Sequence, residues 1–266
     1  MAADVTAVHS HEKPSSHTSP STTPSLASKD HWSLMATLAD VLPPVQSPDE
    51  TLATAQLYYN RYVRFISTTS TPNPLDAPTL ALTTLILSTK ATESPRRLHT
   101  VLIPAHRLLN PTAPPLRIPS ATYDALRATL VRAELLLLRV LKFELRHPLA
   151  LEYIPRYLER TIGEVDGADE INDMRREERE EWGVVAPMET GIGKACRAEV
   201  VAAYKNYQLA NFFPARAIAA ACVFRTIQSR GLHVADDVGA WVDDITSRKV
   251  DEEDLNEILL ELNRNT

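Results

Sequence analysis

Apolar side chains recur every three or four residues along most of the chain, the spacing of α-helices that bury one face. Alanine and leucine are abundant, and the prolines fall mostly between these periodic segments, so the pattern predicts an all-α fold. In the first half, capping residues and prolines delimit five helices. They are predicted at residues 31–42, 48–65, 79–91, 96–108 and 121–143.

The second half repeats this organisation after a shift in composition. A charged insert, residues 163–189, contains the run RREEREE and is expected to be a solvated helix or a flexible linker, with no function assigned to it. Five further helices are predicted around it, the last two short, at residues 149–160, 193–209, 215–230, 237–245 and 252–263. The chain is therefore expected to form two successive five-helix domains, 30–146 and 147–266, the second partly abbreviated.

The first 29 residues are rich in Ser, Thr, Pro and His and contain hardly any large apolar side chain. Such a segment buries too little surface to offset its ordering entropy, so we expect a disordered tail. Ser19 and Thr23 precede prolines in this tail, and Ser47 precedes one just beyond it. These three are candidate phosphorylation sites for a proline-directed kinase, although ordinary linker composition also explains them.

Composition and charge exclude several classes of protein. All seven glycines lie at or beyond Gly163, so the first half contains no glycine-rich phosphate loop. The net charge of -6 argues against a generic nucleic-acid or anionic-membrane surface. The N-terminus lacks a signal-peptide pattern, and no apolar run reaches the ~18 residues that span a bilayer. Two widely spaced cysteines, Cys196 and Cys222, indicate free thiols, and we expect an intracellular protein in a reducing compartment.

Catalytic motifs are not found. The sequence from Gly191 to Lys194 has part of a phosphate-loop pattern, but Met188 replaces the first glycine and Ala195 follows the lysine, so a helix cap is the better interpretation. Neither cysteine lies beside a histidine, and the histidines are scattered. The sequence therefore predicts a protein that is not an enzyme and that needs no metal, cofactor or small-molecule ligand.

Two charged residues on apolar helices are the most informative feature. Glu134 has only aliphatic residues one turn before and after it, at positions 130, 131, 137 and 138. Lys90 ends the preceding apolar helix. Burying a carboxylate on an apolar stripe is costly unless a cation or several donors meet it. The pair predicts either a docking patch for a partner chain or an internal ion pair, and the residues alone leave both possibilities open.

Residues 53–62 (ATAQLYYNRY), residues 85–90 with Glu93, and residues 132–143 (RAELLLLRVLKF) resemble the second, third and fifth helices of a cyclin box. Residues 213–221 (FPARAIAAA) resemble the proline-then-alanine-rich helix of a second box. The likeness covers about residues 31–263 and is greatest to the cyclin Q and transcription-type members. It implies tandem cyclin boxes, preceded here by the polar tail.

The resemblance implies a non-catalytic subunit that binds and activates a cyclin-dependent protein kinase, in the nucleus or cytoplasm, in transcription or growth regulation. The partner is expected to dock through its regulatory helix, without membrane or direct nucleic-acid contact. In the family, the lysine that ends the third helix and the glutamate of the fifth hold that helix, and these positions match Lys90 and Glu134. The other expected kinase-binding residues adjoin them: Leu82, Ile86, Glu93, Arg96, Arg97, Leu98, Leu137 and Leu138.

Two departures from the family pattern stand out. Thr92 replaces an acid that many cyclins carry after the lysine, and Asn60 replaces a common acid or histidine. Two other interpretations remain beside the kinase activator. One is a cyclin-fold binder of nucleic acid and polymerase, similar to general transcription factor B proteins, which the acidic charge disfavours. The other is a helical scaffold in which Lys90 and Glu134 pair with each other or are dispensable.

Overall fold

The computed structural model describes residues 29–41, 48–69, 72–162 and 187–264. Within these ranges the chain is all-helical, with eleven α-helices, two short 3-10 helices and no strand. The all-α prediction is thus confirmed for the described part of the chain. The predicted tail and most of the charged insert lie outside the described residues, as do Ser19, Thr23 and Ser47.

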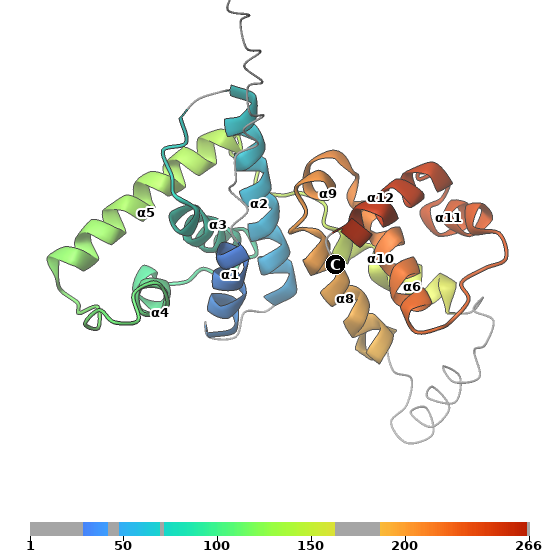
Figure 1. Ribbon diagram of the computed structural model, residues 1–266, viewed down its shortest axis with the longest axis horizontal. Helices are drawn as coiled ribbons and strands as arrows, with labels where there is room; N and C mark the ends of the chain where they lie inside the picture. Colours follow the sequence, from blue (N-terminus) through green and yellow to red (C-terminus); the bar gives the residue numbers. More distant parts are fainter. Residues whose placement is uncertain (1–28, 42–47, 70–71, 163–186, 265–266) are drawn as a thin grey trace, which may run out of the picture.

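All five helices predicted in the first half are present (Figure 1). Ser120 caps the fifth of them by accepting a hydrogen bond from the Tyr123 amide at 3.2 Å, as its position before the apolar run predicts. That helix ends at Val140 rather than at residue 143, because Lys142 and Phe143 adopt left-handed φ angles of 53° and 60°. The helices are α1 (Lys29–Val41), α2 (Pro48–Thr69), α3 (Ala77–Ala91), α4 (Leu98–Leu109) and α5 (Ala121–Val140).

The described residues of the second half form six α-helices where five were predicted, because the helix expected over residues 193–209 is two helices. Asn206 interrupts it: its side-chain oxygen accepts from the amides of Gln208, at 2.7 Å, and Leu209, at 3.2 Å, and so starts a new helix. The 3-10 helices are η1 (Ala150–Glu152) and η2 (Pro187–Glu189). The α-helices are α6 (Ile154–Thr161), α8 (Gly191–Ala203), α9 (Tyr207–Phe212), α10 (Ala215–Ser229), α11 (Val238–Thr246) and α12 (Glu252–Arg264).

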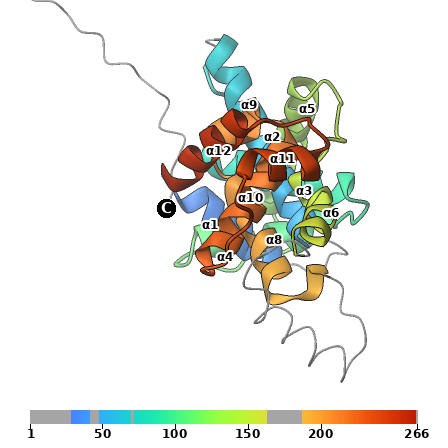
Figure 2. The ribbon, with the colours of Figure 1, turned by 90° about the vertical axis from the view of Figure 1, so that its right-hand side faces the viewer.

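The buried apolar side chains form two separate cores. The first core lies among α1 to α5 and ends in the sequence at Leu141. The second lies mainly among residues from Leu149 onwards and is centred on α10, which contacts α6, α8, α11 and α12 around it (Figure 2). Two residues of α2, Ala53 and Leu57, belong to the second core. The helix α2 therefore packs into both halves of the molecule.

Polar contacts along α2 join the two halves, which lie on either side of this helix in Figure 1. The buried Asn60 side-chain amide donates to the Tyr204 carbonyl oxygen at 2.8 Å. Asn211 of α9 donates back to the Asn60 carbonyl at 3.3 Å, and the Arg64 guanidinium donates to the Asn211 carbonyl at 2.8 Å. The sequence position that departs from the cyclin pattern thus holds a buried hydrogen bond between the two halves.

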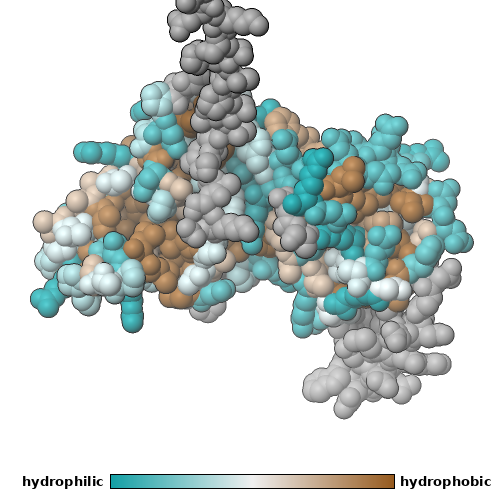
Figure 3. All heavy atoms as spheres, in the orientation of Figure 1, coloured by the Kyte–Doolittle hydropathy of each residue, from teal (hydrophilic) through white to brown (hydrophobic). Residues whose placement is uncertain are grey.

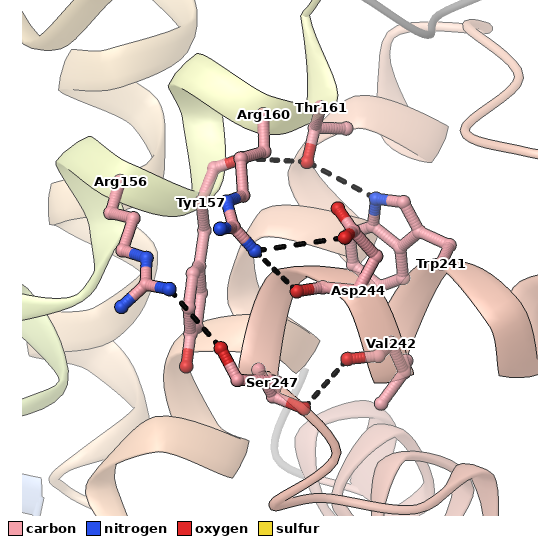
Figure 4. A network of polar contacts seen from close by, with 9 residues as sticks. Arg156, Tyr157, Arg160, Thr161, Trp241, Val242, Asp244 and Ser247 are labelled. Atoms are coloured by element: carbon pink, nitrogen blue, oxygen red, sulfur yellow. Dashed lines mark hydrogen bonds and ion pairs between the residues drawn. The ribbon is translucent and has the colours of Figure 1, made fainter.

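A second polar network fastens α6 to α11 within the second half (Figure 4). The indole N–H of Trp241 donates to the Thr161 hydroxyl at 3.1 Å, and both residues are buried. Arg160 forms an ion pair with Asp244 at 3.7 Å and also donates to the carbonyl of the same residue. Arg156 donates to the hydroxyl of Ser247 at 3.1 Å. These bonds satisfy the polar groups that two packed helices leave at their contact.

Candidate functional site

Lys90 and Glu134 meet in the first half, where they form a direct ion pair between Lys90 Nζ and Glu134 Oε1. The preceding residues of α3, from Leu80 to Thr89, are all buried, whereas Lys90 is exposed. Side-chain exposure is 42% for Lys90 and 19% for Glu134. The carboxylate is therefore shielded but reachable, and the ammonium lies at the surface above it.

The aliphatic neighbours of Glu134 differ in their burial. Leu130 and Leu137 are buried at 4% and 0% exposure, and they anchor α5 on the first core. Leu82 and Ile86 of α3 are likewise buried, at 6% and 3%. The expectation that Leu82, Ile86 and Leu137 offer apolar surface to a partner is therefore wrong for the free chain. They support the ion pair from below, because α3 is enclosed by α1, α2, α4 and α5.

An accessible apolar strip lies on α5 beside Glu134. Val131 is 46% exposed, Leu135 is 50% exposed, and Leu138 is half-buried. At 100° per residue these three side chains point in one direction, adjacent to that of Glu134. Only Leu138 was expected at this site from the sequence. Val131 and Leu135 are four residues apart, a spacing that places them on the same face of a helix. This spacing was the signal in the sequence that could have identified the rest of the strip.

Phe143 adds a large exposed ring just beyond the end of α5. Its side chain is 66% exposed, while its amide donates to the Leu138 carbonyl at 2.8 Å and so fixes the turn that carries the ring. Sequence reasoning placed this residue inside the helix, where periodicity gives no indication of its exposure. An exposed phenylalanine whose backbone is fixed by a hydrogen-bonded turn has the rigidity and apolar area that suit an anchor for a partner chain.

The turn after Lys90 is held by short polar contacts. Thr92 donates to the Ser88 carbonyl at 3.0 Å, and its hydroxyl lies 2.9 Å from that of Thr51 on α2. Glu93 has a φ of 56° and pairs with Arg146 at 3.4 Å, with both side chains at least 80% exposed. Thr92, where many cyclins have an acid, therefore ties the end of α3 to α2.

The remaining expected site residues lie at the start of α4. Arg97 is exposed and occupies the capping position of α4, where its carbonyl accepts from the Thr100 amide at 3.0 Å. Arg96 is half-buried, and Leu98 packs against the first core. These three residues follow the Glu93 turn along the chain. They extend the charged edge but add little accessible apolar surface.

Apolar surface is concentrated on the first half of the molecule. In the view of Figure 3 it gathers over the region of α4 and α5. On α4, Ile103 is 40% exposed, Leu108 is 44% exposed and Leu109 is 42% exposed. Exposed aliphatic residues that cluster on neighbouring helices are typical of a surface that binds another chain.

Metal and membrane sites are not evident in the described ranges. These ranges contain no group of three or more His, Cys, Asp or Glu side chains placed to hold a metal ion. None of their helices is both long enough and apolar enough to cross a bilayer. Gly191 and Gly193 lie at the start of α8, where Thr190 caps the helix by accepting from the Gly193 amide at 3.1 Å. The helix-cap interpretation of this glycine-containing segment is thereby confirmed.

Comparisons with known proteins do not assign a family. No protein-family model matches the chain, and its sequence matches no curated protein. The functional assignment therefore depends on the site itself and on the resemblance of the segments described above.

Proposed function

We propose that this protein is a cyclin-like regulatory subunit that binds and activates a cyclin-dependent protein kinase. The observation that carries the proposal is the Lys90–Glu134 pair, which links α3 to α5 and is bordered by the accessible side chains Val131, Leu135 and Leu138. The shielded Glu134 and the exposed Lys90 can select a partner of complementary charge, and the apolar strip beside them provides area that binding can remove from water.

The pair is suited to exchanging its partners on docking. In the free chain the ammonium and carboxylate neutralise each other, so neither is left uncompensated while no partner is bound. When a helix of the kinase docks, Lys90 can donate to the carbonyl groups at its end, and Glu134 can accept from its amides or basic side chains. The apolar strip then supplies the area removed from water.

Activation follows from the position that the docked helix takes. In protein kinases, a glutamate on the regulatory helix must pair with the lysine that contacts the ATP phosphates before phosphoryl transfer is efficient. A rigid face that holds this helix inward stabilises the active arrangement. The regulatory subunit needs no catalytic group of its own, which agrees with the absence of a catalytic motif in the sequence.

A helical scaffold would also contain an internal Lys90–Glu134 pair, so the pair alone does not separate the two proposals. A reversal of the two charges separates them. In the double variant Lys90→Glu/Glu134→Lys the internal pair is rebuilt with its charges exchanged, so the free fold is retained. A partner that binds through these two charges would face a like charge at both positions. Its affinity is therefore expected to fall by a factor of at least one hundred.

The experiment combines affinity capture with a kinase assay. Wild-type chain, the charge-reversed variant and a control variant, Lys249→Glu/Glu253→Lys on the second half, are immobilised, and captured kinases are identified by mass spectrometry. Each identified kinase is then purified and its activity on a peptide substrate is measured with and without the chain. We expect a kinase that binds and is activated by the wild type and the control but not by the reversed variant. Capture by the reversed variant equal to wild type, or no kinase captured by wild type, would overturn the proposal.

A further inference from the structure

A groove of about 590 Å³ lies where the two halves of the chain meet. A second cavity of about 240 Å³ continues from it, and the two share three wall residues, Glu50, Leu149 and Glu152. The groove runs between the first turns of α2, the turn after α3 and the segment that leads into η1. Its remaining walls include Thr54, Ala91, Glu93, Leu145 and Pro148.

Three glutamates, Glu50, Glu93 and Glu152, and one arginine, Arg146, line the larger groove, so acidic groups are in excess. Asp49 is paired with Arg197 at 2.8 Å, and Glu93 with Arg146 at 3.4 Å. Glu50 and Glu152, which line both cavities, have no ion-pair partner among the described residues. One Glu152 oxygen accepts from the Leu149 amide at 3.0 Å, which leaves the other oxygen for a ligand. Two carboxylates facing one groove favour a cationic occupant.

The hydroxyl of Thr54 is a second, independent indication of a ligand. Thr54 lies on α2 one turn after Glu50 and in the wall of the larger cavity, and only 7% of its surface is exposed. Within the described part of the chain its side chain forms no hydrogen bond. Its oxygen is not among the buried side-chain atoms that lack a partner, so the hydroxyl faces the space of the groove, where it can donate to or accept from a ligand group.

We infer that this groove is a docking site for a short basic peptide segment of a second protein, with an arginine or lysine side chain seated between Glu50 and Glu152. A guanidinium can bond two carboxylates at once. The groove also has apolar walls, formed by Leu145, Pro148 and Leu149, and the hydroxyl of Thr54. These features can contact the neighbouring side chains and the backbone of a peptide, whereas an isolated cation would use neither of them. The inference does not rest on the proposed kinase function: neither Lys90 nor Glu134 lines the groove, and Glu93, the one expected kinase-binding residue in its wall, is not among the groups that hold the peptide.

Calorimetric titration of the purified full-length chain tests the inference without any kinase. The probes are tetra-arginine amide and tetra-citrulline amide, which have similar shapes but differ in charge, and spermine, which has charge but no peptide backbone. Arginine peptide is expected to bind wild type at least tenfold more tightly than either other probe. The variant Glu50→Gln/Glu152→Gln keeps the side-chain acceptor for the Leu149 amide and is expected to weaken arginine-peptide binding at least tenfold.

The control variant Glu252→Gln/Glu253→Gln changes the net charge by the same amount on α12, away from the groove, and is expected to bind like wild type. Thr54→Val is expected to weaken binding severalfold. Equal loss of affinity in both glutamine variants would show general electrostatic attraction and overturn the site. Equal binding of spermine and the arginine peptide would overturn the assignment of a peptide. Absence of measurable binding to wild type would overturn the inference and leave the kinase proposal unaffected.

Discussion

The Asn60 side chain of α2 donates a buried hydrogen bond of 2.8 Å to the main-chain oxygen of Tyr204, 144 residues further along the chain. Tyr204 is the C-cap of α8, and its hydroxyl accepts a hydrogen bond of 2.9 Å from the amide of Ala150, at the start of η1. The two bonds tie α2 to the second half at the same tyrosine. They give the joint between the two halves a polar, directional contact in addition to its apolar packing.

Replacing Asn60 by alanine should therefore destabilise the whole chain. The substitution leaves the Tyr204 carbonyl without its donor at a buried position, and the free energy of unfolding should fall by about 1–3 kcal/mol. Urea denaturation followed by circular dichroism measures this change. Asn256→Ala, at an exposed position on α12, is the matched control and should alter stability by less than about 0.5 kcal/mol. Equal stability of the two variants would contradict the role given to Asn60.

Two leucines of α5 should separate stability from partner binding. Leu137 is completely buried, so Leu137→Ala should lower the free energy of unfolding by about 2–5 kcal/mol. Leu135 is half exposed, so Leu135→Ala should change it by less than about 0.5 kcal/mol. The same Leu135→Ala variant should nevertheless lose affinity for the proposed kinase partner. Unchanged kinase affinity, measured by calorimetry, would remove Leu135 from the docking face.

Stability should also depend on pH through His147. Burial, and then the positive charge of Arg61, lower the pKa of this imidazole below its ordinary value of 6.5. The Arg61 guanidinium lies 2.8 Å from Nε2 of the ring, which favours the neutral form, while Glu144 opposes the shift. Because the unfolded chain binds the proton more readily, the stabilisation is present above pH 6.5 and is lost as the pH falls through the lowered pKa.

Urea midpoints measured between pH 7.5 and pH 5.5 test this dependence. Wild type should become less stable as the pH falls over this range. His147→Gln, which keeps an acceptor for Arg61 but does not titrate, should show a smaller decrease. Parallel curves for the two proteins would assign the pH dependence to other groups.

The two cysteines should be unreactive in the native protein. Both side chains are fully buried, and burial raises the pKa of the Cys196 thiol to about 11 and that of Cys222 well above its ordinary value. Since the thiolate is the reactive form, labelling by a thiol reagent at pH 8 should be slow in the folded chain and complete within minutes in 6 M guanidinium. Mass spectrometry after timed quenching gives the rates. Rapid labelling of the folded protein at either position would contradict the described packing.

Much of the secondary structure followed from local patterns in the sequence. The five helices of the first half were found because their apolar spacing and their caps depend on residues within a few positions of one another. The break between α8 and α9 was missed because apolar periodicity continues through it, although Asn206, a strong capping residue, was the local signal. The end of α5 was missed because two non-glycine residues adopt left-handed angles there.

The sequence by itself determined that the chain is helical, where most helices lie, and which two charged residues stand on apolar surfaces. Only the tertiary structure decided that Lys90 and Glu134 meet and that Leu82, Ile86 and Leu137 are enclosed while Val131 and Leu135 remain accessible. It also decided that α2 joins both cores and borders a groove. The physical reason is that periodicity reports which face of a helix is apolar, whereas burial of that face depends on neighbours that are distant in the sequence.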